Sequence, residues 1–144
     1  MTGRYALGND AVLTLSEDYV IEMITHAKED APNECCGIIA GDDGTAHKLY
    51  RAINAEASPY RYSVDPKDLL RIYRDLDSNG WDVLVIYHSH TQTAAYPSPT
   101  DVRLAAWDDA YYVIVSLENN DDPVVRAFRI KDGEVTEEEL EIVE

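Results

Sequence analysis

Apolar residues recur along this chain in two periods, one typical of helices and one typical of strands. After Ser16, apolar positions spaced by three or four residues form one stripe, which the proline at position 32 ends. The members of this stripe are Val20, Ile21, Ile24 and Ala27. A second stripe follows Asp65, which resembles an N-cap before a proline at the first helical position, and it ends at Gly80. The sequence therefore predicts two amphipathic helices.

Shorter runs of alternating or continuous apolar residues predict strands. Gly- and Asp-rich turns separate or follow some of them, at residues 41–44 and 131–133. The expected strands cover residues 35–40, 45–52, 60–64, 82–87, 111–117 and 124–130. The acidic residues 134–144 alternate weakly, as an edge strand would, and residues 101–107 are typical of the start of another helix. Together they predict an α/β or α+β fold with a sheet covered by helices, whose strand order the periodicity leaves open.

Length and charge narrow the class of protein. The chain has 144 residues, a length typical of one domain, so we expect residues 1–144 to form a single domain. The 28 acidic and 12 basic side chains give a net charge of −16, which repels phosphate backbones and anionic membrane surfaces. We therefore expect no nucleic-acid or membrane partner. No apolar stretch is long enough to cross a bilayer, and the first residues lack a signal-peptide pattern, so a cytoplasmic protein is expected.

The two cysteines, Cys35 and Cys36, are adjacent and cannot link distant parts of the chain. We expect buried, reduced thiols, with redox control through a vicinal disulfide or thiol oxidation as the alternative. Two histidines, His26 and His47, stand apart from any group of metal ligands, and we expect them to be solvated or hydrogen bonded.

The residues with the clearest chemistry are His88 and His90, which follow the strand over residues 82–87. Side chains alternate faces along a strand, so two histidines separated by one residue point to the same side and can bind one cation. Asp101 is the expected third ligand. Two imidazole nitrogens and one carboxylate oxygen suit zinc, and three protein ligands leave a position for water, as in catalytic zinc sites.

A zinc hydrolase also needs a base to accept a proton from water, and Glu34 is the candidate. Ser98 allows two interpretations. Together with Asp101 it forms a Ser-x-x-Asp pattern, which resembles a capping box at a helix start. The other interpretation, a contribution of its hydroxyl to catalysis, is favoured, and the two roles are compatible in part.

This arrangement resembles the signature of the JAMM/MPN+ zinc isopeptidases: Glu34, then His88-x-His90, seven residues, Ser98, two residues and Asp101. The resemblance covers roughly residues 12–143 and is strongest to the small prokaryotic branch. It includes residues 34–41, 85–91, 95–98 and 112–116. Cys35 departs from the pattern, because a small residue such as alanine is expected there. It occupies no motif position, so the expected mechanism is unaffected.

The resemblance implies both a fold and a set of roles. The fold is an MPN/JAMM core, a curved, mixed but mostly antiparallel sheet flanked by helices and akin to cytidine deaminases. His88, His90 and Asp101 correspond to the ligands of one Zn²⁺ per chain. Glu34 corresponds to the catalytic base that also passes a proton to the leaving amine, and Ser98 to the serine that steadies the water or the oxyanion.

The implied function is a zinc-dependent peptidase or isopeptidase that hydrolyses the amide after the C-terminal Gly-Gly of a ubiquitin-like or sulfur-carrier protein. Within the branch, release of cysteine from a sulfur carrier is the favoured reaction. Alternatives are an isopeptidase that acts on conjugates of ubiquitin-like proteins with lysine, and a non-catalytic MPN interaction module, although such modules typically lose ligands that this chain keeps. A zinc deaminase is disfavoured because the Cys-x-x-Cys ligand pair is absent. The sequence does not distinguish a monomer from a homodimer.

Overall fold

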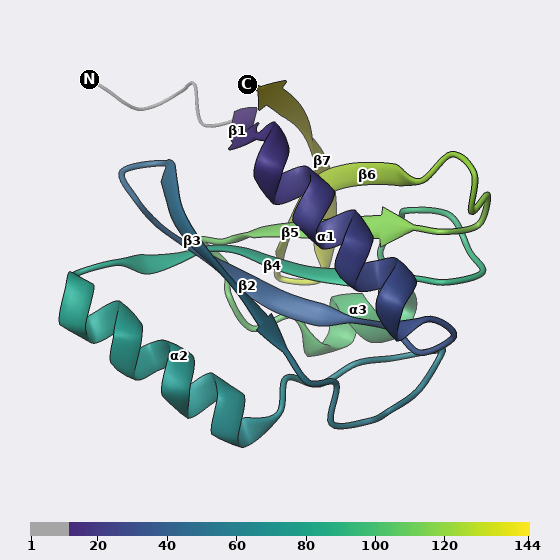
Figure 1. Cartoon of the computed structure of the whole chain (residues 1–144), viewed down its shortest axis with the longest axis horizontal. Coiled ribbons are helices and arrows are strands. Elements are labelled where there is room, and N and C mark those ends of the chain that lie inside the picture. The colour runs from purple at the N-terminus through teal and green to yellow at the C-terminus, as the bar shows by residue number, and fades with distance from the viewer. Residues whose placement is uncertain (1–11) are drawn as a thin grey trace.

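The computed structural model describes residues 12–144, which form one seven-stranded sheet and three α-helices (Figure 1). The elements in chain order are β1 (Val12–Ser16), α1 (Glu17–Asp30), β2 (Cys36–Asp42), β3 (Thr45–Ala52), α2 (Pro66–Asn79), β4 (Asp82–His90), α3 (Pro99–Leu104), β5 (Tyr111–Ser116), β6 (Val124–Lys131) and β7 (Glu134–Val143). The strand order is β1-β7-β6-β5-β4-β2-β3. The pairs β1/β7 and β4/β5 are parallel and the other four are antiparallel, so the expected mixed, mostly antiparallel sheet is confirmed.

Helices cover both faces of this sheet (Figure 1). Alternate residues of β4 show the division: Val85 and Tyr87 pack in a cluster with α1, whereas Ile86 packs in a second cluster with α2 and α3. Because both faces are covered, β4 and β5 are buried strands with continuous apolar runs. The C-terminal end of β4, with His88 and His90, therefore extends from a strand that is buried on both faces.

The helix ends follow the chemistry expected from the sequence. The Ser16 hydroxyl accepts a hydrogen bond from the backbone N–H of Asp18 at the start of α1. The Asp65 carboxylate caps α2 in the same way, and Gly80, with φ of 70°, ends it in the left-handed region. The third helix begins two residues before Asp101, because Ser98 is its N-cap.

Two strand predictions need correction. Residues 60–64 form no strand; a single bridge joins Asn54 to Val64. The Asn54 side chain instead donates to the Arg61 carbonyl and accepts from the Ser63 N–H, so side-chain hydrogen bonds replace a ladder. The acidic C-terminal segment is a strand, but β7 is not at the edge. It lies between β6 and β1, because β1 adds a parallel strand that its short, weakly patterned sequence did not reveal.

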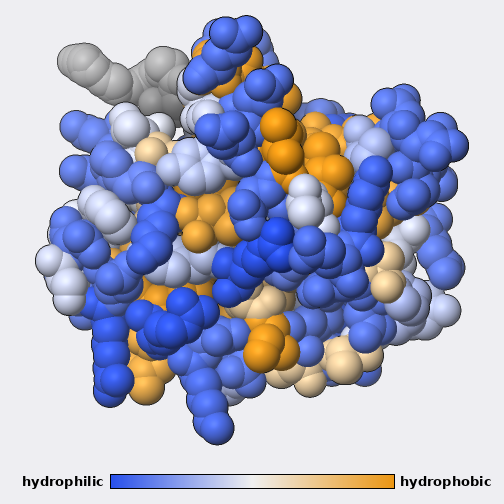
Figure 2. Space-filling view, viewed as in Figure 1, coloured by the Kyte–Doolittle hydropathy of each residue, from blue (hydrophilic) through white to orange (hydrophobic). Residues whose placement is uncertain are grey.

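Cys35 and Cys36 are buried free thiols, as expected, and burial raises the pKa of each to about 12. His26 is buried with its Nδ1 2.7 Å from the Tyr87 hydroxyl, and His47 stacks on Trp81. Both histidines have ordinary structural surroundings. The face in Figure 2 is mostly hydrophilic, with hydrophobic residues in separate patches. None of the helices within residues 12–144 is long and apolar enough to span a membrane.

Candidate active site

The C-terminal end of β4 places two histidines between β2 and β5. In the sheet, His88 is paired with Cys36 of β2 and with Ile114 of β5. Ser89 points to the opposite face, where its hydroxyl accepts a hydrogen bond of 2.8 Å from the Cys35 N–H. Because side chains alternate along the strand, His88 and His90 lie on one side of the sheet. Ser89 lies on the other side, where it is hydrogen bonded to Cys35, the residue before β2.

Three ligand atoms converge on one point. The Nε2 atoms of His88 and His90 lie 3.2 Å apart, and each lies 3.1 Å from Oδ2 of Asp101. Ligands of a tetrahedral zinc ion at about 2.0–2.1 Å from the metal lie about 3.3 Å from one another. The observed triangle therefore fits one face of a zinc tetrahedron, and the sequence-predicted ligands are together in the structure.

Asp101 is held in place by the start of α3. Its Oδ2 accepts a hydrogen bond of 2.9 Å from the Ser98 N–H, while its own N–H donates to the Ser98 hydroxyl at 3.1 Å. Burial raises the pKa of the Asp101 carboxyl, but hydrogen bonds with His88 and His90 outweigh burial and hold that pKa well below its usual range. The group is therefore a carboxylate, as a metal ligand must be.

The orientation of both imidazoles is fixed by neighbours. Nδ1 of His90 lies 2.8 Å from the Ala94 carbonyl, which makes Nδ1 the protonated nitrogen and leaves the Nε2 lone pair for a metal. The ring of His88 stacks on the half-buried ring of Tyr62 at a centroid distance of 4.3 Å. Burial lowers the pKa of His88, which favours the neutral ligand form. Its Nδ1 has no hydrogen-bond partner among residues 12–144.

Glu34 lies in the segment between α1 and β2, where neighbouring strands and loops fix its backbone. Its N–H donates to the Ser58 carbonyl at 2.9 Å, and its own carbonyl accepts from the Asn54 side chain at 3.0 Å. The side chain is 4% exposed, and within the described residues its Oε1 has no hydrogen-bond partner. An unpaired carboxylate oxygen of this kind can accept a proton from water.

Burial raises the pKa of Glu34 to about 8; His90 opposes this shift and Asp101 adds to it. His90 and Asp101 affect Glu34 because β2 pairs with β4. This pairing places Glu34, which precedes β2, near the candidate ligands at the end of β4. A cation bound by the ligand triangle would favour the carboxylate form of Glu34. The structure thus places a buried carboxyl group with a raised pKa near the three candidate ligands.

Sequence reasoning missed the parts of the site that come from the loop between β3 and α2. Asn54 holds the Glu34 carbonyl, and Tyr62 covers His88. Neither residue has a periodic or motif signal, since the loop's interactions are between side chains and distant backbone groups. Ser89 lies within the histidine motif, and alternation along the strand predicts that its side chain points to the face opposite His88 and His90.

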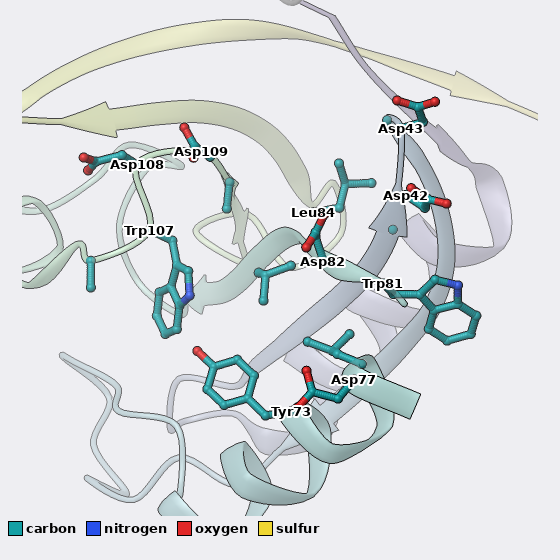
Figure 3. Close-up of a pocket in the computed structure, with 16 residues that line it drawn as sticks. Asp42, Asp43, Tyr73, Asp77, Trp81, Asp82, Leu84, Trp107, Asp108 and Asp109 are labelled. Carbon is teal, nitrogen blue, oxygen red and sulfur yellow. The ribbon is translucent and has the colours of Figure 1, made fainter. Parts of the chain in front are cut away.

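A separate hollow lies at the other end of β4 and is not part of this site. Its volume is about 680 Å³, and Asp42, Asp77, Asp82, Trp81 and Trp107 are among the residues that line it (Figure 3). No metal ligand lines it. The nine residues of β4 place it about 25–30 Å from the C-terminal end of the strand. Its aspartates form part of the acidic surface.

Comparison with known families assigns the class. The sequence model of the prokaryotic homologs of the JAB domain matches residues 16–131. The chain therefore belongs to this prokaryotic JAB family, which is part of the JAMM/MPN class, and the resemblance found in the sequence is confirmed. Its members include named peptidases, so the chain is a JAMM-type hydrolase.

Individual relatives cover almost the whole chain. The CysO-cysteine peptidase of Mycobacterium tuberculosis is 42% identical over 139 residues, which are 95% of each protein. A desampylase of Haloferax volcanii is 34% identical over 111 residues, or 72% of this chain and 80% of that protein.

Solved structures agree on the fold. A protein from Desulfitobacterium hafniense, solved in solution, has a TM-score of 0.82 at 37% identity, covering 92% of this chain and 93% of its own. A JAB1/MPN domain protein from Archaeoglobus fulgidus has a TM-score of 0.60 at 23% identity, covering 92% of this chain and 97% of its own, which shows a shared fold.

Proposed function

We propose that this protein is a zinc-dependent peptidase that hydrolyses the amide after the C-terminal Gly-Gly of a ubiquitin-like or sulfur-carrier protein and releases cysteine. The observation that carries the chemistry is the triangle of His88, His90 and Asp101, with sides of 3.1–3.2 Å, beside the buried carboxyl group of Glu34. Those three side chains would hold one Zn²⁺. Zinc bound there would supply Lewis acidity, which would lower the pKa of water to about 7 and polarise a carbonyl.

Glu34 is proposed as the base. Its Oε1 is buried and has no partner within residues 12–144, so it can accept the proton of the attacking water. The protonated carboxyl group then donates this proton to the nitrogen of the leaving amine. The hydrogen bonds of the Glu34 backbone to Ser58 and Asn54 keep the side chain in position throughout the reaction.

Ser98 is proposed to act mainly through Asp101. Its hydroxyl oxygen accepts a hydrogen bond from the Asp101 N–H, and a hydroxyl can still donate its own proton to a water or an oxyanion. Both roles suggested by the sequence are therefore compatible with the same side chain.

The substrate is proposed from the relatives and the chemistry of the site. The name of the Mycobacterium tuberculosis protein states that it acts on cysteine joined to CysO, and 42% identity over 95% of both chains favours the same type of substrate here. An amide that reaches ligands at the end of a strand must enter as an extended chain. Two glycines before the cut bond permit close approach, because glycine has no Cβ. A cytoplasmic location is part of the same proposal.

The second candidate is an isopeptidase that acts on conjugates of ubiquitin-like proteins with lysine. The similarity to the Haloferax volcanii desampylase favours it. The two candidates share the carrier tail and the metal chemistry, and they differ in the leaving group.

The test compares four substrates at equal concentration: carrier-Gly-Gly-Cys, the same carrier with Ala-Ala in place of Gly-Gly, a free peptide with the same tail, and the carrier joined to a lysine side chain. Released product is followed by mass spectrometry. We expect fastest release from carrier-Gly-Gly-Cys. Equal rates on the first three would show that neither the glycines nor the carrier surface is recognised, and would reduce the assignment to a general zinc peptidase.

A further inference from the structure

A pocket beside the metal ligands contains one arginine. It has a volume of about 320 Å³ and is lined by the ligand Asp101 and by Arg61. Glu56, the partner of Arg61, also lines it, and most of the remaining wall is apolar, with Val64, Leu69, Ile86, Leu104 and Trp107. A hollow with an apolar wall and a cation at its edge suits a small side chain whose neighbouring group carries a negative charge.

The guanidinium group of Arg61 is less engaged than that of Arg51. Arg51 lies 2.6 Å from two carboxylates, those of Glu22 and Glu29. For Arg61, the ionic contact recorded within residues 12–144 is a distance of 3.8 Å from Nε to Glu56, and the side chain is 59% exposed. The planar fork of its terminal nitrogens can therefore still bind a carboxylate through two parallel hydrogen bonds.

The backbone of Arg61 is held close to the proposed base. One nitrogen, Nδ2 of Asn54, donates to the carbonyl oxygens of both Glu34 and Arg61, at 3.0 Å each. The next residue, Tyr62, stacks on His88. The backbone of Arg61 is therefore tied to the segments that carry Glu34 and His88, and its side chain lines the same pocket as Asp101.

The leaving groups of the two proposed substrates differ in charge. Cysteine bound through its amine to a carrier keeps a free α-carboxylate, separated from the cut amide nitrogen by a single carbon. The Gly-Gly side has neither side chains nor charge, and a lysine within a protein presents neutral peptide groups instead. In a chain with a net charge of −16, a substrate carboxylate needs a local cation.

We propose that Arg61 binds the free α-carboxylate of a single C-terminal amino acid and so selects release of that residue over cleavage of lysine conjugates. This proposal rests on the proposed function and specifies the leaving group of the same site. Arg61 is a specificity residue here, and the hydrolytic groups remain Glu34 and the metal ligands.

The test compares carrier-Gly-Gly-Cys with the same carrier ending in cysteinamide, which lacks only the negative charge. Wild type should prefer the acid by about 10-fold in kcat/KM, as expected for a charge-assisted contact that is partly exposed. Arg61→Gln should remove this preference by raising KM for the acid far more than KM for the amide. Arg103→Gln, which removes an exposed arginine from the same helix as Asp101, is the matched control and should keep the preference.

Binding provides a second readout that needs no turnover. In a Glu34→Gln background, the dissociation constant for carrier-Gly-Gly-Cys, measured by calorimetry, should rise about 10-fold on adding Arg61→Gln, with a much smaller change for the amide. Cleavage of acid and amide at equal rates, unaffected by Arg61→Gln, would overturn the role of Arg61 and leave the proposed peptidase intact. Failure of wild type to cleave either one would instead overturn the proposed function, and this proposal with it.

Discussion

Ser98 and Asp101 hold each other through two hydrogen bonds: the Ser98 N–H donates to Asp101 Oδ2 at 2.9 Å, and the Asp101 N–H donates to the Ser98 hydroxyl at 3.1 Å. The same Oδ2 lies 3.1 Å from Nε2 of His88 and of His90. One carboxylate oxygen therefore both caps α3 and completes the ligand triangle. A short helix can hold a ligand firmly because the capping box fixes the side chain that does the binding.

The first prediction concerns the metal. Replacing His88, His90 or Asp101 by alanine should lower zinc content well below the expected value of about one per chain, and activity should fall with it. Metal content measured by emission spectrometry after dialysis checks this, with His47→Ala as a control that removes an exposed histidine away from the site. Full activity in protein shown to be free of metal would refute the mechanism.

The second prediction separates chemistry from binding at Glu34. Glu34→Gln keeps the size of the side chain but cannot accept a proton, so turnover should fall by at least about 10²-fold while zinc is retained. Parallel measurement of kcat and of metal content is the test. A variant that stays active, or one that loses its zinc, would remove Glu34 from the role of base.

The third prediction concerns Ser98. Ser98→Ala removes the hydroxyl that accepts from the Asp101 N–H and should cost about 1 kcal/mol of stability in urea unfolding. Ser98→Thr keeps a capping hydroxyl and should retain most of this stability. If kcat of Ser98→Ala falls by about 10² or more, the hydroxyl also stabilises the oxyanion; a smaller fall assigns it to capping alone.

The fourth prediction is a pH dependence of stability in metal-free protein. Burial raises the pKa of Glu34 in the folded state to about 8 from an ordinary value of 4.5, so the folded protein binds this proton more tightly than the unfolded chain. The resulting contribution to stability is complete below about pH 4.5 and is lost as pH rises through 8. Glu34→Gln should therefore be more stable than wild type at pH 8.5, by up to a few kcal/mol, and equal to it near pH 4. Thermal unfolding with a chelator present tests this, and a difference that stays constant with pH would contradict it.

The fifth prediction concerns Gly37 in β2. A Cβ at this position would lie 2.3–2.4 Å from three atoms of the buried Tyr87 side chain, whose hydroxyl is fixed beside His26. Gly37→Ala should therefore destabilise the fold by about 1–3 kcal/mol through overpacking. In a double-mutant cycle, Tyr87→Leu should remove much of the additional cost of the alanine. An additive result would show that the two residues do not compete for space.

The helices and the ligand set were accessible from sequence because both depend on short-range rules. Ser16 and Asp65 cap helices through their own neighbours, and the spacing of His88 and His90 puts them on one face of any strand. The Ser98 to Asp101 spacing likewise encodes a capping box within four residues. The family resemblance added the expected role of Glu34, which spacing alone could not have selected among 28 acidic residues.

Short-range patterns in the sequence therefore predicted the helix ends, a mixed fold and the three side chains that the structure brings together, His88, His90 and Asp101. The tertiary structure decided what depends on contacts between distant segments. It placed β7 inside the sheet by adding β1, and it turned the expected strand at 60–64 into a loop held by Asn54. In that loop, Tyr62 stacks on His88, and Arg61 lines the same pocket as Asp101. Its hydrogen bonds join side chains to remote backbone groups, and such contacts follow from the order of the strands rather than from any period in the sequence.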